Sequence, residues 1–158
     1  YLNKLGYQVT GVDLSENSIA IAQESSNETL QFKTHDMREP MNETYDAVFN
    51  LFTSFGYFDT HEDNIKTLKA IKESINEYGF GVIDFIIENL VAEETKEIDG
   101  ITFHIKRSVE NKKIIKEIRF EDKGESFFFT EKVSAFTLAD FEEMMEEADI
   151  YLLEIYCD

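Results

Sequence analysis

Two aspartates, Asp13 and Asp36, each come at or just after the end of a short apolar run that predicts a buried strand. A carboxylate at a strand end can accept hydrogen bonds from both hydroxyls of a ribose, because a charged acceptor suits a diol with two donors. A second carboxylate at the next strand end can accept from the exocyclic amine of adenine. Each also has an ordinary explanation, a helix N-cap for Asp13 and a solvated turn for Asp36. Together the two residues favour a nucleoside-shaped site more than either does alone.

The first half of the chain alternates apolar runs with helical patterns. Strands are predicted at residues 7–12, 30–34, 45–52 and 79–87. Ser15 is predicted to cap the helix after the first of them. The helix before the fourth strand carries an apolar face at spacings of three and four, with Ile65, Leu68, Ile71 and Ile75. Near-continuous apolar strands separated by helices indicate a parallel sheet covered on both faces. Ligands bind such a sheet at the carboxyl ends of its strands, so the segments after these strands are expected to share one edge.

The second half of the chain has a different pattern. Alternating apolar and polar residues, with turns near 111–113 and 122–125, predict an antiparallel meander over residues 98–136. Thr137 and Asp140 resemble a capping box that begins a helix, and residues 150–156 predict a last strand. We therefore expect a single domain over residues 1–158, in which the meander is an insertion into an α/β sheet.

Composition excludes several classes of function. The 158 residues are 42% hydrophobic and 30% charged, as in one folded domain. With 15 Lys and Arg against 33 Asp and Glu, the net charge of −18 argues against nucleic acid or an anionic membrane as a partner. Neither a membrane-spanning apolar run nor a signal peptide is present in this sequence, and we expect a cytoplasmic protein. The single cysteine, Cys157, excludes an internal disulfide, and His35 and His104 have no partner at metal-binding spacing, so no metal site is predicted.

Residues 5–15, Leu-Gly-Tyr-Gln-Val-Thr-Gly-Val-Asp-Leu-Ser, resemble the second-strand motif of class I S-adenosylmethionine-dependent methyltransferases. Asp36-Met37 resembles the next motif of that family, and Tyr-Asp-Ala-Val at residues 45–48 resembles its fourth-strand motif. Residues 137–158 are similar to its late helix and strand. The resemblance covers nearly the whole chain. It implies a Rossmann-like α/β fold, a mostly parallel sheet with an antiparallel β-meander insertion.

The resemblance also implies a role for individual residues. S-adenosyl-L-methionine would be the cofactor and a small molecule the methyl acceptor. Asp13 would hold the ribose hydroxyls, and Leu14 would lie against the adenine. The remaining cofactor contacts would come from Asp36 and Met37 at the adenine and from Asn50 and Leu51 at the methionine part. Phe55, Gly56 and Tyr57 would face the substrate, and the 98–136 meander would form a lid.

A general base is needed only if the nucleophile arrives protonated. Tyr57 and His61 are the nearest candidates for this catalytic role. The alternatives are a packing aromatic for Tyr57 and a helix-capping residue for His61. The aromatic loop with Phe52, Phe55 and Tyr57 suits a small apolar or cationic acceptor, the latter through cation–π contact, although core packing explains Phe52 and Phe55 equally well.

The chain departs from the family pattern at both ends. The family's Gly-rich turn would lie before Tyr1 and its closing strand after Asp158. The resemblance therefore implies a fold that is incomplete at both ends, with open sheet edges and exposed apolar surface. Such edges make self-association into a homo-oligomer an expectation.

Two other functions remain open. The first is a nicotinamide-dependent oxidoreductase, which also uses an acidic residue after the second strand. The chain lacks the Tyr-x-x-x-Lys pair of the short-chain type. The second is a non-catalytic binding or partner protein that keeps the fold without the cofactor site.

Overall fold

The computed structural model describes residues 1–85 and 92–156. Residues 86–87, predicted to end the fourth strand, and Cys157 lie outside the described residues. The elements, in chain order, are η1 (Leu2–Leu5), β1 (Val9–Asp13), α1 (Glu16–Gln23), β2 (Leu30–Thr34), β3 (Tyr45–Asn50), α2 (His61–Glu73), β4 (Ile75–Ile83), β5 (Ala92–Ile98), β6 (Ile101–Glu110), β7 (Lys113–Asp122), β8 (Glu125–Ser134) and α3 (Leu138–Glu147).

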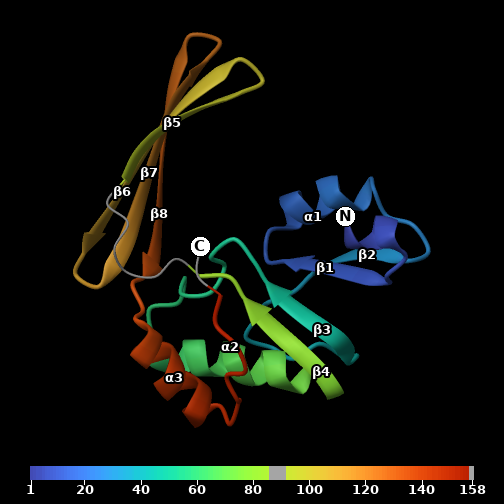
Figure 1. Ribbon diagram of the computed structural model, residues 1–158. Helices are drawn as coiled ribbons and strands as arrows, with labels where there is room; N and C mark the ends of the chain where they lie inside the picture. The colour runs from blue at the N-terminus through green and yellow to red at the C-terminus, as the bar shows by residue number, and fades with distance from the viewer. Residues whose placement is uncertain (86–91, 157–158) are drawn as a thin grey trace.

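Within residues 1–85 and 92–156 the strands form three separate sheets (Figure 1). β1 pairs in parallel with β2, β3 pairs in parallel with β4, and β5 to β8 form an antiparallel meander. The predicted combination of parallel strands and an antiparallel insertion is confirmed. The single sheet expected for the first half is not found, because β1 and β3 share no ladder within the described chain. Apolar side chains on these strands are accordingly exposed, as expected for open edges: Val12, Phe49, Phe80 and Val82.

The boundary between α2 and β4 differs from the prediction. Ile75 opposes Tyr45 as the first residue of β4, and it does not belong to the helix face. The helix ends because Ser74 serves as its C-cap, with its hydroxyl donating to the carbonyl of Ala70 at 2.7 Å. The chain then enters the strand without a loop, so the apolar spacing continues across the boundary and conceals it.

The meander begins at Ala92 and thus earlier than residue 98. The sequence did not predict β5, because the strand carries charged side chains on both faces; its residues are Ala-Glu-Glu-Thr-Lys-Glu-Ile. The meander twists away from the rest of the molecule as a long arm (Figure 1). Its hairpins turn where predicted, through left-handed residues at 111–112 and 123–124, which fit the twist of paired strands. Ile114 and Val133 form a small core at the base of the arm.

The last predicted strand is wrong. Residues 150–156 form no strand, although their apolar residues alternate in part. Tyr151, Leu153 and Tyr156 are 84%, 79% and 86% exposed. No described strand pairs with this segment, and period-two patterning alone does not hold a strand.

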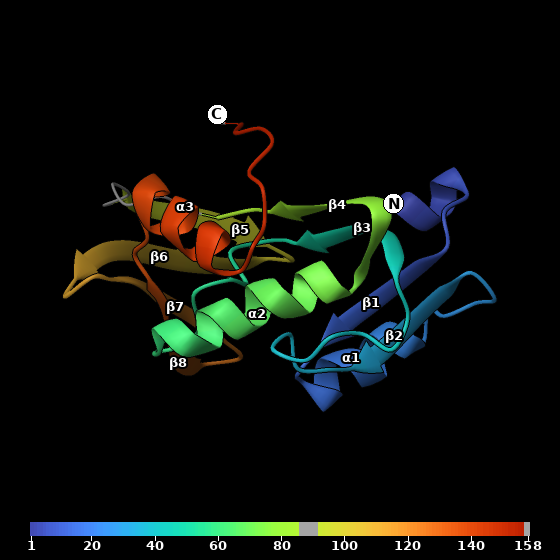
Figure 2. The same cartoon turned by 90° about the horizontal axis from the view of Figure 1, so that it is seen from below.

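The main core lies between α2, α3 and the loop after β3. Figure 2, seen from below, shows α2 in front of β3 and β4, with α3 beside α2. Phe55, Leu68 and Met144 are at most 2% exposed in this core. The predicted capping box begins α3, with the Thr137 hydroxyl and the Asp140 carboxylate each bonded to the other residue's backbone N–H. None of the described helices is long and apolar enough to span a membrane.

Gly56 is required for the route of the chain through this core. Its φ of +94° is a left-handed conformation that side chains disfavour. A Cβ atom at this position would lie 3.1 Å from Cε2 of Phe85 and 3.4 Å from Cε2 of Phe136. The Gly56 carbonyl accepts a hydrogen bond of 2.7 Å from the backbone of Ser134, at the end of β8. The glycine thus joins the loop after β3 to the meander.

We expect Gly56→Ala to lower the free energy of unfolding by about 1–3 kcal/mol, because backbone strain adds to crowding against two rings. Gly124→Ala is the matched control, with a φ of +83° and no atom within 4 Å of the added Cβ. Backbone strain alone should cost about 1 kcal/mol there. Urea unfolding of both variants measures the difference, and equal losses would contradict the packing role of Gly56.

Candidate functional site

The carboxyl ends of β1 to β4 form one continuous edge although the strands belong to two sheets. The carbonyl of Asp13 accepts from the N–H of His35 at 3.0 Å, which joins β1 to the end of β2. The side-chain amide of Asn50 lies 3.6 Å from the sulfur of Met37, which joins β2 to β3. The N–H of Asp84 donates to the carbonyl of Asn50 at 2.8 Å, which joins β3 to β4. The predicted convergence of these four ends is confirmed.

Asp13 presents a carboxylate at this edge. Its Oδ1 accepts the N–H of Ser15 at 2.7 Å, and Ser15 in turn caps α1 through its hydroxyl. Ser15 is therefore the N-cap, as predicted, and the capping explanation for Asp13 does not apply. The other oxygen of Asp13 has no hydrogen bond within the described chain. Leu14 beside it is 67% exposed, so an open carboxylate oxygen lies next to an open apolar side chain.

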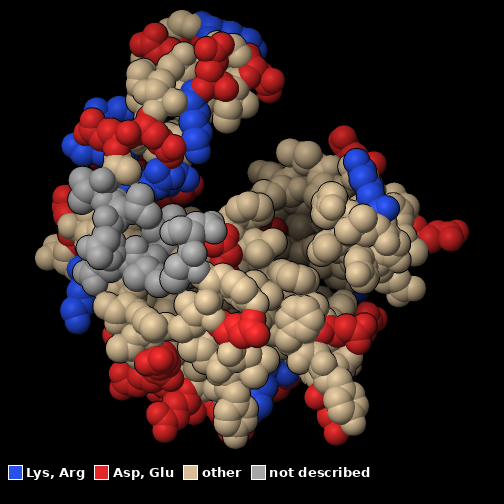
Figure 3. All heavy atoms as spheres, in the orientation of Figure 1, with Lys and Arg blue, Asp and Glu red and all other residues tan. Residues whose placement is uncertain are grey.

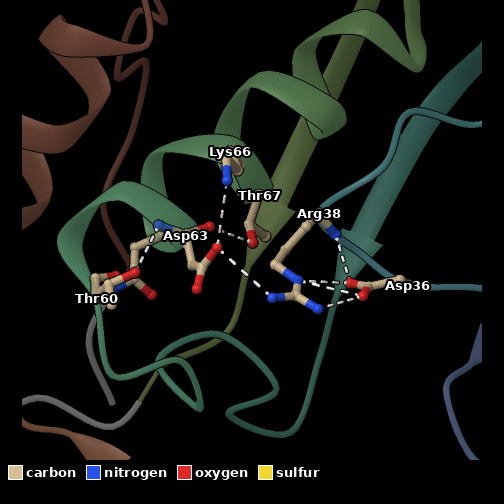
Figure 4. A network of polar contacts seen from close by, with 7 residues as sticks. Asp36, Arg38, Thr60, Asp63, Lys66 and Thr67 are labelled. Atoms are coloured by element: carbon tan, nitrogen blue, oxygen red, sulfur yellow. Dashed lines mark hydrogen bonds and ion pairs between the residues drawn. The ribbon is translucent and has the colours of Figure 1, made fainter.

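Asp36 is engaged by Arg38 in an ion pair (Figure 4). The guanidinium Nε lies 3.1 Å from Oδ1 of Asp36, a second nitrogen lies 2.6 Å from Oδ2, and the backbone N–H of Arg38 also donates to Oδ1. These hydrogen bonds lower the pKa of the Asp36 carboxyl below its usual value. The carboxylate predicted to hold adenine is thus already bonded within the chain.

Arg38 contacts two further residues besides Asp36. Its guanidinium lies 3.5 Å from a carboxylate oxygen of Asp63 and 4.6 Å from the ring centre of Phe58. Asp63 lies in the first turn of α2, where its N–H donates to the hydroxyl of the N-cap Thr60 (Figure 4). Arg38 therefore ties the loop after β2 to the start of α2. Sequence reasoning missed this residue, and an arginine in a turn carries no pattern that would reveal it.

Asn50 carries a second acceptor oxygen at this edge. Its side-chain oxygen is buried and has no hydrogen-bond partner within the described chain. A buried amide oxygen without a partner is costly and calls for an explanation such as a ligand donor. Leu51, the next residue, is 39% exposed. The open oxygens of Asp13 and Asn50 fit a ligand that carries hydroxyl or amine donors.

The turn after β3 is strained. Phe52 and Thr53 both have a φ of +59°, a left-handed conformation that is rare for a β-branched residue such as threonine. Asp84 holds this turn, because its Oδ2 accepts the N–H of Phe52 at 3.0 Å and its carbonyl accepts the N–H of Thr53 at 3.2 Å. Strain of this kind persists only where neighbouring contacts impose it, and it concentrates at functional sites. Asp84 directly follows β4, and Asp13 is the last residue of β1, but the sequence assigned Asp84 no individual role.

A cavity of about 290 Å³ opens between this strained turn and the meander. Its lining combines the turn, the end of β4 and three meander strands: Phe52, Thr53, Tyr57, Asp84, Arg107, Ile114, Lys116, Glu131 and Val133. Burial, and secondly the negative charge of Glu131, raise the pKa of the Tyr57 hydroxyl. The hydroxyl is therefore protonated at neutral pH, which favours hydrogen-bond donation over the proton abstraction expected from the sequence.

The other residues expected at the substrate lie elsewhere. Phe55 has no exposed surface and packs against Phe141, with ring centres 5.4 Å apart. Gly56 faces core rings rather than the cavity. His61 is the first residue of α2, and its side chain is 57% exposed with Nε2 2.7 Å from a carboxylate oxygen of Glu147 on α3. Four residues were expected at the substrate or in catalysis, and only one of them, Tyr57, lines the cavity.

Comparison with known proteins identifies the family. Residues 1–79, half of the chain, match the family described as "Methyltransferase domain". The chain belongs to this methyltransferase family. A relative from Bacillus subtilis (strain 168), named "Putative methyltransferase YqeM", is 27% identical over 173 residues, which cover 99% of this chain and 70% of the relative.

Solved methyltransferases share the fold. The CcbJ methyltransferase from Streptomyces caelestis superposes with a TM-score of 0.79 at 15% identity, covering 97% of this chain and 68% of CcbJ. CalS10, an amino pentose methyltransferase from Micromonospora echinaspora, gives a TM-score of 0.73 at 19% identity, covering 89% of this chain and 65% of CalS10. The chain spans 62% of a similar methyltransferase from Clostridium acetobutylicum ATCC 824, less than two thirds of its length.

The ion pair between Asp36 and Arg38 predicts a pH-dependent stability. Because the folded-state pKa of Asp36 is below the usual 3.8, the pair stabilises the folded chain above about pH 4, and this contribution is lost as the pH falls through the folded-state pKa. We expect Asp36→Asn to lower the free energy of unfolding at neutral pH and to have a diminishing effect on acidification, as measured by urea unfolding. In an Arg38→Gln background this pH dependence should be smaller, because only the backbone N–H of residue 38 then still bonds the carboxylate, and an undiminished pH dependence there would rule out the ion pair as its main source.

Proposed function

We propose that this member of the methyltransferase family transfers a methyl group from S-adenosyl-L-methionine to a small-molecule acceptor. The observation that carries the proposal is the strand edge with two open acceptor oxygens, on Asp13 and Asn50, next to a cavity. In an α/β fold this edge is where nucleotide-like ligands bind. The family match and the shared fold support the same reaction over a nicotinamide-dependent one.

The residues at the edge fit such a cofactor. The open oxygen of Asp13 would accept from the ribose hydroxyls, and Leu14 would cover the adenine. Asn50 would accept from an amine donor of the methionine part, with Met37 and Leu51 beside it. Arg38 is bonded to both carboxylate oxygens of Asp36. Asp36 would therefore accept a hydrogen bond from the adenine amine only through a lone pair that Arg38 does not use. CalS10 was solved with S-adenosylmethionine and the glycopeptide N-methyltransferase MtfA with S-adenosylhomocysteine, which supports this choice of cofactor.

When bound, the cofactor supplies an electrophilic methyl group on a sulfonium. The chain's own residues would then align the acceptor with that methyl group and exclude water. Tyr57, held protonated by burial and by Glu131, would donate a hydrogen bond to the acceptor. The carboxylates of Asp84 and Glu131, which line the same cavity, are placed to receive a proton if the nucleophile arrives protonated. They replace His61 as candidates for a general base.

Contacts between the meander and the loop after β3 support its proposed role as a lid. The backbone of Ser134 donates to the carbonyl of Gly56, and the ammonium of Lys113 lies 2.9 Å from a carboxylate oxygen of Asp59. Residues 92–134 would therefore close the cavity on the side opposite the strand edge. A small acceptor suits a cavity of about 290 Å³, and CalS10 is itself an amino pentose methyltransferase.

We expect S-adenosylhomocysteine to bind the protein and Asp13→Asn to weaken that binding by about 10- to 100-fold, because the ribose loses a charge-assisted hydrogen bond. Asparagine keeps an acceptor for the N–H of Ser15, so the local turn is retained. Isothermal titration calorimetry measures both dissociation constants.

Asp122→Asn is the matched control, since Asp122 also ends a strand but lies in the meander, at the end of β7. Its binding of S-adenosylhomocysteine should equal that of the unsubstituted protein. Equal binding by the Asp13 and Asp122 variants would reject the assignment of Asp13, and the absence of any binding by a folded protein would favour the non-catalytic alternative.

A further inference from the structure

We propose that the methyl acceptor carries an anionic group, a carboxylate or a phosphate, and that Arg107 and Lys116 bind this group in the cavity between the strained turn and the meander. This inference rests on the proposed function, since it names the class of acceptor for the same site. Both side chains line the cavity. Neither was singled out by the sequence, and the proposed acceptor differs from the apolar or cationic one expected there.

The two cations lie directly opposite each other. Arg107 on β6 and Lys116 on β7 are register partners in the antiparallel ladder, so their side chains leave the same face of the sheet. Like charges opposite each other on neighbouring strands destabilise a sheet. Arg107 is also only 17% exposed, which strengthens the repulsion by limiting solvent screening. Glu94 and Glu131 on the outer strands offset part of this repulsion, and an anion between the two cations would offset more of it.

Each cation has one carboxylate partner on an outer strand. Glu94 on β5 lies 2.6 Å from the guanidinium of Arg107, and Glu131 on β8 lies 2.9 Å from the ammonium of Lys116. A guanidinium carries five N–H donors and an ammonium carries three. The partners fix the two side chains without using all of their donors, so N–H groups remain for a ligand in the cavity.

The two carboxylates that line the cavity, those of Asp84 and Glu131, are less suited to bind a cationic acceptor. One oxygen of Asp84 accepts the N–H of Phe52 and holds the strained turn. One oxygen of Glu131 is bonded to Lys116. The cavity therefore has two neighbouring cations, Arg107 and Lys116, flanked by Glu131 on the meander side, and the hydroxyl of Tyr57 toward the strand ends. An acceptor would place its anionic group on the meander and its nucleophile near Tyr57.

The distribution of charge over the whole chain agrees with this orientation. Residues 92–136 contain nine of the 15 Lys and Arg but ten of the 33 Asp and Glu, so their net charge is −1 against −17 for the rest of the chain. Figure 3 shows Lys and Arg along the meander arm, interspersed with Asp and Glu. A small anion is repelled by most of this protein and least by the meander.

Nuclear magnetic resonance titration tests the site with three phenyl compounds of similar size and different charge: benzoate, the neutral benzamide and benzylammonium. Phenyl phosphate is added as a fourth arm to distinguish a phosphate from a carboxylate group. The reporters are the backbone amides of Thr53, Ile114 and Val133, which line the cavity. We expect benzoate or phenyl phosphate to shift these resonances and to bind at least about tenfold more tightly than benzamide, since the contact is charge-assisted.

Lys116→Met should weaken anion binding by about tenfold or more. Lys106→Met is its matched control, because Lys106 is the neighbour of Arg107 along β6, is also paired with a glutamate, and does not line the cavity. Arg107→Lys, which keeps the charge that pairs with Glu94, is a second variant that limits disturbance of the fold. It should weaken phenyl phosphate or benzoate through the loss of the planar guanidinium fork.

The inference is overturned if benzylammonium binds the cavity as tightly as benzoate, if Lys106→Met and Lys116→Met have equal effects, or if no probe shifts the reporter resonances. The calorimetric titration with S-adenosylhomocysteine gives the separate test of the proposed function. Cofactor binding without anion binding would reject the anion site alone. Anion binding without cofactor binding would support the site while rejecting its use in methyl transfer.

Discussion

The loop that follows β3 is bonded on two sides, and both the strand edge and the cavity depend on it. On one side the carboxylate and carbonyl of Asp84 hold its first turn in a left-handed conformation. On the other side its Gly56 carbonyl is bonded to the end of β8, and the Phe55 side chain is fully buried between them. Moving any of these contacts would displace Asn50 and Tyr57 together, because they lie on the same short stretch of chain.

The sequence predicted the elements that rest on local patterns. Apolar strands, the capping box of α3 and the hairpin turns of the meander all follow from neighbouring residues. It failed where pairing over distance decides. β5 is too charged to be recognised without its partner β6, and residues 150–156 have a strand pattern without a strand beside them. The absence of a ladder between β1 and β3 is likewise a property of tertiary arrangement that no local pattern contains.

The candidate site shows the same division. Asp13 was predicted from its place at a strand end and Asn50 from the family resemblance, and both carry a side-chain oxygen without a hydrogen-bond partner in the described chain. Tyr57 was found through its loop, but its raised pKa depends on burial and secondly on the charge of Glu131, which is far away in the sequence. Arg107, Lys116 and Glu131 were missed because each comes from a different strand. They lie side by side across β6, β7 and β8 only after the strands pair, so no fixed spacing in the sequence identifies them. Arg38 is a similar case, since its partners come from two loops and a helix.

The separation of the parallel strands into two pairs has a dynamic consequence. η1, β1, α1 and β2 pack mainly on each other, and the contacts of Met37 with Asn50 and of Arg38 with Asp63 and Phe58 join this unit to the body. Because these contacts are few, we expect the unit to open at a lower free energy than the whole chain unfolds. Asp13 lies on it and Asn50 lies on the body. A ligand that contacts both residues therefore uses part of its binding free energy to restrain the unit. We expect the hydrogen-exchange protection of β1 to rise as the ligand occupies the strand edge.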